Sequence, residues 1–316
     1  MNELIEALRN REVWPHPCRQ IDVMETHISW VVLTGEFAYK IKKPVRFHFV
    51  DFSTLEQRRR SCEDEVRLNR RLAADLYLDV VPIGGTPAAP EIVARHALEY
   101  AVAMAQIDQS DSMDQRLGLS EIQPQGFQAL AERIDAFHAG MVPIRRLNEH
   151  QAAQRTFDAL MSASKPATQK RLEVVGEWLR EYTVSLDSRF QQRVADGCIR
   201  ECHGDLHLGN LVWLGNRITP FDCIEFSREL RCIDTLDEVA FLVMDLIAHD
   251  RPDLGFDFLN RYLEITGDYN GVRLLRYYLV YRALVRSYVR VLAAGPGKSP
   301  ESTPYLDLAS QLVQRS

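Results

Sequence analysis

Short apolar runs that alternate with polar residues occupy the first third of the chain. Ile28–Thr34 and Phe37–Lys42 flank a Gly-Glu pair, which predicts a β-hairpin. Two further runs, Leu78–Ile83 and Glu99–Met104, have strand character. The turn-forming residues Gly84–Pro87 lie between them. This pattern predicts a small antiparallel sheet.

A helical period stands in the middle of these strands. Ser53 is a candidate N-cap and Glu56 follows three residues later, which is the pattern of a capping box. Apolar residues then recur at helical spacing as far as about Leu72. We therefore expect the order strand, strand, helix, strand, strand.

The rest of the chain is mainly helical in its pattern. After a polar connector, Asp108–Asp114, helices are predicted over Phe127–Ala139, Ala167–Leu186, Leu236–Ala248, Phe256–Thr266 and Val272–Ala293. A hairpin interrupts them, with the apolar runs Leu211–Leu214 and Ile218–Phe221 around a Gly-Asn turn. The predicted fold is α+β and bilobal. A small antiparallel sheet lobe, residues 1–106, would precede a larger helical lobe, residues 107–316.

Composition excludes several classes of protein. A hydrophobic content of 46% and a charged content of 26% are those of an ordinary globular chain. The net charge of -6 argues against a general nucleic-acid binder. No apolar run approaches the roughly 18–20 residues that span a bilayer. The first residues, Met1–Glu6, lack the basic and then apolar order of a signal peptide. We expect a cytoplasmic protein without a membrane partner, and the charge does not favour a nucleic-acid partner.

The six cysteines do not indicate a metal or redox site. No two of them form a Cys-x-x-Cys pair, so their spacing fits neither a zinc ribbon nor a redox dithiol. Buried, reduced thiols that pack as small apolar groups are expected instead.

One polar segment carries the spacing of a catalytic loop. His203 and Asp205 are separated by one residue, and Asn210 follows five residues after Asp205. Asp222 comes twelve residues after Asn210, behind an apolar strand. Phosphoryl transfer needs one carboxylate at the acceptor hydroxyl, and an Asn and a second carboxylate at magnesium. We therefore assign Asp205 as the base, and Asn210 and Asp222 as metal ligands in the same cleft. His203 is expected to orient the loop.

The segment resembles the catalytic loop of the aminoglycoside phosphotransferase and choline kinase group, which has the protein-kinase-like fold. The resemblance extends over nearly the whole chain, through Glu25–Trp30, Ala38–Pro44, Ile224–Phe226 and Asp237–Phe241. It is closer still to a bacterial subgroup that is often fused to a C-terminal P-loop ATPase domain. The resemblance implies ATP and Mg²⁺ as cofactors. It also implies an acceptor hydroxyl, and a P-loop ATPase as a possible partner.

A kinase needs a strand lysine for the phosphates and a helical glutamate that positions it. Residues two apart share one face of a strand, so Ala38 would face the adenine and Lys40 the phosphates. Lys42 lies on the same face and competes with Lys40 for this role. Glu65 is the predicted partner, although Glu63 and Asp64 are close in sequence. Met104 and Gln106, where the last predicted strand ends, are assigned to nucleotide binding.

Two features of protein kinases are absent from the sequence. No Gly-x-Gly-x-x-Gly precedes the lysine, so a glycine-poor turn near Thr26–Ser29 or Thr34–Glu36 would contact the phosphates. The Asp-Phe-Gly sequence is replaced by Asp222-Cys223-Ile224. Because related small-molecule kinases also lack the Phe-Gly pair, the change suggests a kinase without that switch.

The sequence gives two opposite indications of the acceptor's charge. Acidic residues are frequent after the loop, and an acidic cleft attracts polyamines; they are Glu225, Glu229, Asp234, Asp237, Glu238, Asp245 and Asp250. Arg282 and Arg286, on one helical face with Arg290, would instead bind a carboxylate or phosphate. Glu225 would reach a second metal or a substrate hydroxyl, or pair with Arg228 or Arg231. Asp237 is read as structural.

The sequence therefore predicts an ATP- and magnesium-dependent phosphotransferase acting on a hydroxyl of a small molecule. One alternative is a kinase whose acceptor is a protein or an RNA. Another is a non-catalytic nucleotide-binding module that serves a partner, for which the missing glycine loop is the support. A binder needs no base, so the presence of Asp205 favours catalysis.

Overall fold

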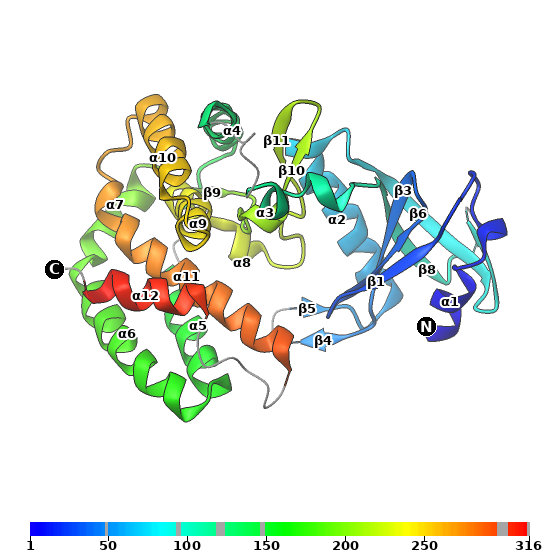
Figure 1. The fold of residues 1–316 in the computed structure, drawn as a ribbon, viewed down its shortest axis with the longest axis horizontal. Helices are drawn as coiled ribbons and strands as arrows, with labels where there is room; N and C mark the ends of the chain where they lie inside the picture. Colours follow the sequence, from blue (N-terminus) through cyan, green and yellow to red (C-terminus); the bar gives the residue numbers. More distant parts are fainter. Residues whose placement is uncertain (48–49, 93–95, 118–123, 146–148, 296–302, 315–316) are drawn as a thin grey trace. The chain divides into compact units, whose positions relative to one another are not determined.

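The computed structural model describes residues 1–47, 50–92, 96–117, 124–145, 149–295 and 303–314 (Figure 1). Contacts between residues divide the chain into two units. The sheet unit comprises Met1–Arg116, Val212–Leu214 and Thr219–Arg228. The helical unit comprises Leu117–Leu211, Gly215–Ile218 and Glu229–Ser316. The fold is α+β with an antiparallel sheet lobe and a helical lobe, as the sequence predicted.

The sheet unit is built on six strands in the order β1-β2-β3-β8-β6-β7, with every neighbouring pair antiparallel. The strands are β1 (Asp22–Glu25), β2 (Ser29–Leu33), β3 (Phe37–Lys42), β6 (Tyr77–Thr86), β7 (Ala89–Ile92) and β8 (Glu99–Ala105). Two short strands, β4 (Arg46–Phe47) and β5 (Val50–Asp51), pair separately. The predicted hairpin is thus present as β2 and β3, and β3 lies in the interior of the sheet.

Helix α2 (Leu55–Ala73) packs against β6 and β8. Its N-cap is Thr54, whose hydroxyl accepts from the backbone of Gln57 while the Gln57 side chain accepts from Thr54. The capping box therefore begins one residue later than predicted. The Ser53 hydroxyl instead donates to the Asp51 carboxylate. This helix places Glu65 against the face of β3 that carries Lys40.

The predicted turn at Gly84–Pro87 is confirmed at Pro87 and wrong for Gly84–Thr86. Strand β6 continues through both glycines to Thr86 and pairs with β7 around residues 87–88. Gly85 has φ +78°, and a Cβ there would lie 2.4 Å from the carbonyl oxygen of Ala89. The glycine therefore permits a close strand approach, not a chain reversal.

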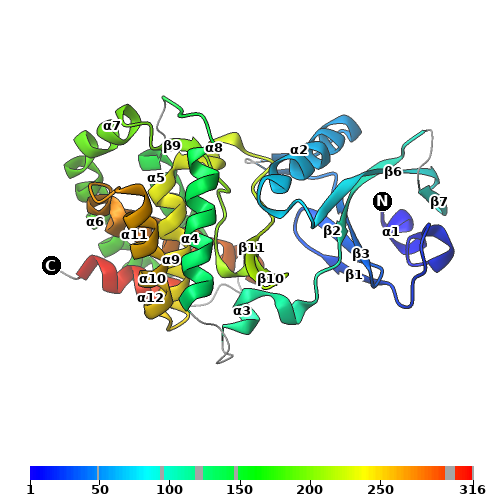
Figure 2. The same cartoon turned by 90° about the horizontal axis from the view of Figure 1, so that it is seen from above.

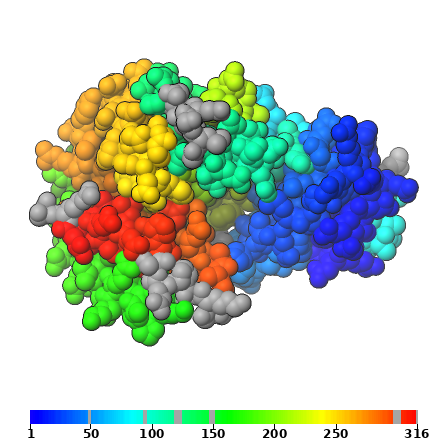
Figure 3. All heavy atoms as spheres, in the orientation of Figure 1, coloured from blue at the N-terminus to red at the C-terminus, as the bar shows by residue number. Residues whose placement is uncertain are grey.

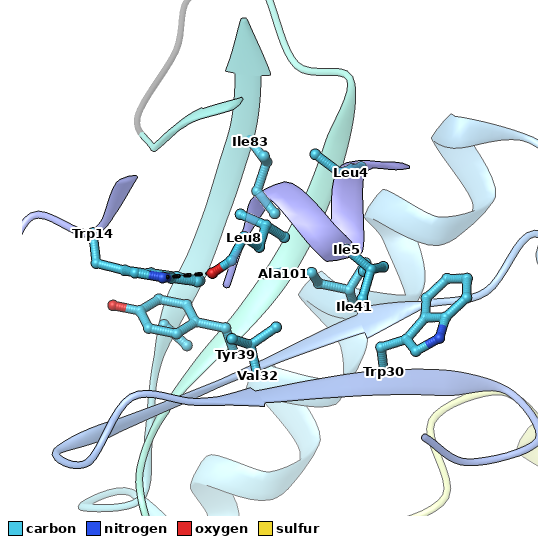
Figure 4. Close-up of a cluster of buried hydrophobic side chains, with 11 residues drawn as sticks. Leu4, Ile5, Leu8, Trp14, Trp30, Val32, Tyr39, Ile41, Ile83 and Ala101 are labelled. Carbon is cyan, nitrogen blue, oxygen red and sulfur yellow. Dashed lines mark hydrogen bonds between the residues drawn. The ribbon is translucent and has the colours of Figure 1, made fainter. Parts of the chain in front are cut away.

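The other face of the sheet is covered by the N-terminal segment. Helix α1 (Asn2–Ala7) and the 3₁₀ turn η1 (Arg11–Val13) bring Leu4, Ile5, Leu8 and Trp14 onto it (Figure 4). Trp14 donates from Nε1 to the Leu8 carbonyl at 2.9 Å. Figure 2 shows α1 and α2 on opposite faces of the sheet. Apolar side chains of β3 thus pack towards α1, leaving its lysines for the α2 face.

The helical unit consists mostly of long helices. They are α4 (Pro124–Ala139), α5 (Glu149–Ala163), α6 (Pro166–Ser185), α7 (Asp187–Ala195), α9 (Thr235–Ala248), α10 (Pro252–Thr266), α11 (Val272–Ala294) and α12 (Pro304–Gln314). Helix α12 packs against α11 and α6, and α12 and α6 are neighbours on the surface in Figure 3. Helix α9 is buried along nearly its whole length. Short elements here are η3 (Leu208–Asn210), α8 (Arg228–Arg231), and the pair β9 (Ile199–Glu201) and β12 (Cys232–Asp234).

The predicted second hairpin is present as β10 (Leu211–Leu214) and β11 (Arg217–Pro220). Gly215 and Asn216 have φ of 55° and 63°, the left-handed values of a tight hairpin turn. The polar connector before the helices forms η2 (Gln109–Asp111) and α3 (Met113–Arg116).

The structure bears on two expectations from composition, the state of the cysteines and the presence of membrane-spanning helices. All six cysteines are free thiols, and Cys62, Cys202 and Cys223 are buried. Among the described residues, no helix combines the length and the apolar character that crossing a bilayer requires.

Candidate active site

Lys40 lies between two carboxylates on the α2 face of the sheet. Its Nζ is 2.8 Å from Glu65 Oε1 and 2.6 Å from Asp222 Oδ1. The Lys40 side chain is 13% exposed and that of Asp222 is 42% exposed. Burial alone would lower the pKa of Lys40, but Asp222 and Glu65 outweigh burial and raise it well above its ordinary value. The amine therefore stays charged and held in place.

Lys42 has different surroundings. Its Nζ is fully buried and bonds to Glu65 and Glu225. Ser61 donates to the same oxygen of Glu225 at 3.2 Å. Because Lys42 is enclosed by its partners, its amine is less accessible to a ligand than that of Lys40. The geometry also speaks against Glu225 as a substrate or second-metal ligand, since its buried carboxylate is engaged by Lys42.

Glu65 links the two lysines. Burial would raise the pKa of Glu65, but the charges of Lys40 and Lys42 lower it to about 2. Glu63 and Asp64, the rivals in sequence, instead pair with Arg59 and Arg67 on the outer side of α2. One buried carboxylate therefore orients the lysine side chains of β3.

The segment after β11 is fastened to the sheet unit through its backbone. Asp222 N–H donates to the Tyr77 hydroxyl at 3.1 Å, and Cys223 N–H donates to Asn69 Oδ1 at 2.8 Å. Asn69 in turn donates to the Glu65 carbonyl at 2.9 Å. Asp222 itself has φ 60°, a left-handed value that is uncommon for a residue with a side chain. These bonds hold the residue in a conformation that directs its carboxylate at Lys40.

The residues assigned to adenine lie at one end of β3. Ala38 pairs with Met104 across the β3–β8 ladder; Ala38 is buried and Met104 half-buried. Gln106 N–H donates to the Glu36 carbonyl, and its side-chain oxygen accepts from Gly35 N–H at 2.9 Å. Gly35 has φ +99°, which favours glycine. Gln106 therefore fixes the turn between β2 and β3, a contact that the sequence did not indicate.

The turn between β1 and β2 is at the other end of the lysine strand. Thr26 Oγ1 accepts from Ser29 N–H at 2.9 Å, and Thr26 N–H donates to the Ser29 carbonyl. Ser29 pairs with Lys42, whereas the Gly35 turn follows the pairing of Leu33 with Ala38. The turn at Thr26–Ser29 is one of the two candidate phosphate turns. By this pairing it lies at the end of β3 opposite to the proposed adenine residues.

In the helical unit, Asp205 and Asn210 are joined directly. Asn210 Nδ2 donates to the Asp205 carbonyl at 3.0 Å and to Asp205 Oδ2 at 2.8 Å. Both partners are acceptors, so the amide nitrogen is identified and Oδ1 of Asn210 is directed elsewhere. An amide oxygen is a ligand that magnesium accepts. The donor chemistry at Asn210 and at the partly exposed Asp222 therefore fits this metal.

Asp205 is 33% exposed, and His207 lies beside it with Nε2 3.4 Å from Asp205 Oδ2. Burial would raise the pKa of Asp205, but the nearby His207 and Arg286 hold it well below its ordinary value. The carboxylate is therefore ionised at neutral pH. His203 is buried, and its Nδ1 accepts from Asp205 N–H at 3.4 Å.

Carboxylates of α9 hold the backbone of this loop. Glu238 accepts from Gly204 N–H at 2.7 Å and Asp245 from Leu208 N–H at 2.8 Å. Gly204 has φ +87°, and a Cβ there would lie 2.9 Å from the Leu230 carbonyl oxygen. From the sequence, only Asp237 of this helix reads as structural, and Glu238 and Asp245 are missed, although a signal was available. A helix that is hydrophobic on all sides is buried, so its acids need partners inside the protein.

Arg282 also belongs to this brace. It donates from Nε and Nη2 to the two oxygens of Asp237, both at 2.7 Å, and Nη1 lies 3.4 Å from the Gly204 carbonyl. Burial raises the pKa of Asp237 to about 6, against the lowering effect of Arg282. This buried bidentate pair speaks against the acceptor role that the sequence suggested for Arg282.

The other acids of this region have protein partners as well. Asp234 binds Arg193 at 2.6 Å and caps α9, Glu229 pairs with Arg155 at 2.5 Å, and Asp245 accepts from Tyr305 at 2.8 Å. Four of the acids are almost fully buried; they are Asp234, Asp237, Glu238 and Asp245. The acidic cleft that the sequence suggested is therefore mainly an internal network, not an exposed negative surface.

A family model, that of the phosphotransferase enzyme family, matches residues 38–273. The chain belongs to this family. The match includes most of β3, the loop that carries Asp205 and Asn210, and α9. An uncharacterised protein of Mycobacterium tuberculosis is 33% identical over 307 residues, which is 94% of this chain and 60% of that protein. The chain thus spans about 60% of the length of the curated relatives it matches.

Solved structures share the fold of the phosphotransferase. Aminoglycoside phosphotransferase APH(4)-Ia is 12% identical, with a TM-score of 0.56 and 99% of each chain covered. Choline kinase from Cryptosporidium parvum is 13% identical, with a TM-score of 0.55, 99% of this chain and 94% of that chain covered. The sheet lobe and the helical lobe are therefore those of the protein-kinase-like fold.

Proposed function

We propose that this phosphotransferase transfers the γ-phosphate of ATP to a hydroxyl group of a small molecule, with Mg²⁺ as cofactor. The observation that carries the proposal is the position of Lys40, held between Glu65 and the partly exposed Asp222. A lysine and glutamate pair beside a metal-binding aspartate is the phosphate-binding arrangement of kinases. A solved APH(4)-Ia variant in ternary complex with AMP-PNP and hygromycin B supports the use of a nucleotide and a small acceptor.

Each residue has a defined role in the proposed reaction. Lys40 binds the phosphates that are not transferred, and Glu65 fixes its amine. Ala38 and Met104 contact the adenine, while Gln106 positions the turn that follows β2. The turn at Thr26–Ser29 supplies the backbone at the phosphates.

In the helical unit, Asp205 orients the acceptor hydroxyl and accepts its proton as the oxygen attacks. His203 and the α9 carboxylates keep the Asp205 loop in shape. Asn210, through Oδ1, and Asp222 are the proposed metal ligands. Magnesium, when bound, neutralises charge on the phosphate oxygens.

Calorimetric titration of ATP in the presence of Mg²⁺ tests the proposal. The wild type is expected to bind the nucleotide only with the metal, and Asp222→Ala is expected to lose that binding. Asp79→Ala is the matched control, because Asp79 is an exposed acid of the same unit on β6. Absence of binding by the wild type would contradict the proposal and leave a non-nucleotide role. Binding by the wild type that Asp222→Ala leaves unchanged would refute the metal assignment alone.

A further inference from the structure

Arg286 on α11 is a cation close enough to Asp205 to lower the pKa of that carboxyl, and Tyr305 accepts a hydrogen bond from its guanidinium. Its predecessor on the same helical face, Arg282, is engaged by both oxygens of Asp237. Arg286 is half-buried, and its guanidinium carbon lies 5.4 Å from the centre of the Tyr305 ring. The Arg286 Nε is buried, and within the described part of the chain no hydrogen-bond acceptor satisfies it. A buried donor without an acceptor is costly in a folded protein, so it points to a ligand.

The bond that Gly209 makes to His207 indicates which ring nitrogen can accept from Arg286. Gly209 N–H donates to His207 Nδ1 at 3.1 Å, so this nitrogen carries the lone pair. A neutral imidazole then carries its proton on Nε2, where it faces Asp205. Arg286 Nη1 lies 3.0 Å from the same Nε2, and two donors that face each other form no hydrogen bond. The Arg286 guanidinium and the Asp205 carboxylate thus both lie near His207 Nε2. The Nε–H group of Arg286 remains able to donate a hydrogen bond.

The charges around Asp205 indicate what such a donor would bind. The acids of α9, which would attract a polycationic acceptor if exposed, are buried and bonded to protein groups. Burial would raise the pKa of Asp205, and the groups that lower it are His207, His203 and the permanently charged Arg286. In a partly buried site such a charge attracts anions strongly.

We propose that Arg286 binds an anionic group of the acceptor, a carboxylate or a phosphate, next to the hydroxyl that Asp205 activates. This inference rests on the proposed function, since it names the class of acceptor for the same site. The guanidinium would form charge-assisted hydrogen bonds with the anion through Nε and Nη2, an arrangement suited to a two-oxygen group. The preferred acceptors are therefore hydroxy acids and phosphorylated alcohols, not aminoglycosides or choline.

Matched pairs of acceptors test the inference at saturating ATP and Mg²⁺, with the phosphorylated product measured by mass spectrometry. The pairs are glycerate with glycerol, serine with ethanolamine, and glycerol 3-phosphate with glycerol. The anionic member of at least one pair is expected to have a kcat/KM about 10–100-fold higher, the range of a charge-assisted hydrogen bond. The first two pairs report on a carboxylate and the third on a phosphate.

Variants of α11 show whether Arg286 causes the preference. Arg286→Met is expected to lower kcat/KM for the anionic acceptor about 10–100-fold, mainly through KM, and to lower it little for the neutral member. Arg290→Met is the matched control, because Arg290 is an exposed arginine one turn later on the same helix. Phosphorylation of ethanolamine, choline or kanamycin in preference to every anionic compound would overturn the inference and leave the proposed function intact. Failure to bind ATP would overturn the function itself.

A second measurement needs no turnover. In protein saturated with Mg²⁺ and ADP, the Nε–H resonance of Arg286 is followed by NMR while inorganic phosphate or malonate is added, and Arg286→Lys identifies the signal by its loss. A saturable shift of this resonance with either anion is expected. If neither anion shifts it at up to tens of millimolar, Arg286 is not an anion site and the inference is wrong, whatever the acceptor panel shows.

Discussion

Two lysines only two residues apart on β3 have different electrostatic surroundings. Lys40 reaches the partly exposed Asp222, while Lys42 is sealed between Glu65 and Glu225. Alternation along a strand puts both on one face and does not distinguish them. What distinguishes them is the segment that ends at Glu225, which comes from far along the chain. The sequence pattern could therefore offer two candidates for the proposed phosphate-binding lysine but could not choose between them.

Replacement of each lysine by methionine should separate their roles. Lys42→Met leaves two buried carboxylates without their shared cation, and is expected to lower the free energy of unfolding by about 3–5 kcal/mol. Lys40→Met removes a more accessible amine. It is expected to abolish ATP binding with a smaller loss of stability. Urea unfolding followed by circular dichroism measures the first effect and calorimetry the second. Equal losses of stability would contradict the structural role of Lys42.

Acid should weaken the sheet unit through Glu65. The folded pKa of Glu65 is about 2, below its ordinary value of 4.5. The unfolded chain therefore binds the proton first, and the stabilisation is present above pH 4.5 and lost as the pH falls towards 2. Glu65→Gln, which removes the titrating group, is expected to flatten the decline of the free energy of unfolding between pH 5 and 3.5. Urea unfolding at stepped pH measures this. An unchanged slope in the variant would show that other carboxylates dominate.

At the scale of elements, strongly periodic segments were predictable and local geometry was not. The helices α9, α10 and α11 and the hairpin of β2 and β3 agree with the pattern to within a few residues. The capping box was predicted at Ser53 and is formed by Thr54. Both hydroxyls precede the helix, and only the hydrogen bonds in the structure show which of them caps it. The helices α5, α7 and α12 were not predicted. The brace that α9 gives to Gly204 and Leu208 depends on tertiary contacts that no local pattern contains.

The packing of α5 against α6 gives a prediction that opposes helix propensity. Gly176 lies inside α6. In a helix interior, replacing glycine by alanine would normally raise the free energy of unfolding by about 1 kcal/mol. A Cβ there would lie 2.3 Å from Cζ of the buried Phe157. Gly176→Ala is therefore expected to lower the free energy of unfolding by about 1–3 kcal/mol, the usual cost of overpacking. Thermal unfolding measures this.

The double variant Gly176→Ala with Phe157→Leu serves as the control for that experiment. A smaller side chain on α5 makes room for the new methyl group, so part of the loss is expected to return. If Gly176→Ala alone raised stability, the Phe157 ring would have adjusted freely and the contact would not constrain the two helices.

At the scale of the whole molecule, contacts do not follow the chain. The sheet unit contains Thr219–Arg228, although this segment follows β8, the last strand of the six-stranded sheet, by more than a hundred residues. Asp222 and Glu225, which pair with the lysines of β3, both come from it. The sequence correctly predicted a sheet lobe before a helical lobe. The predicted boundary at residue 106 describes the order of the lobes along the chain. It does not account for the ion pairs of Lys40 and Lys42, whose partners Asp222 and Glu225 lie beyond that boundary.

A fragment of residues 1–106 should therefore be less stable than the same strands in the full chain. It keeps Glu65 but lacks the carboxylates of Asp222 and Glu225, so two buried lysines share one counter-ion. Its β3 amides are expected to exchange with solvent faster than those of the full protein, as hydrogen exchange with mass spectrometry would show. Equal protection in both would mean that the later segment adds no stability to the sheet.

The fastening of Asp222 to Tyr77, and of Cys223 to Asn69, has a consequence for how such enzymes diversify. A genetic exchange that replaced all residues after the sheet lobe would join residues 219–228 of a relative to the α2 and β3 of this chain. The contacts between these segments would then no longer match. Hybrid genes with a single crossover would tend to lose the backbone support of Asp222, the proposed metal ligand. If Arg286 binds the acceptor as proposed, new acceptor preferences are then reached more readily by single substitutions on α11 than by exchange of whole lobes among relatives.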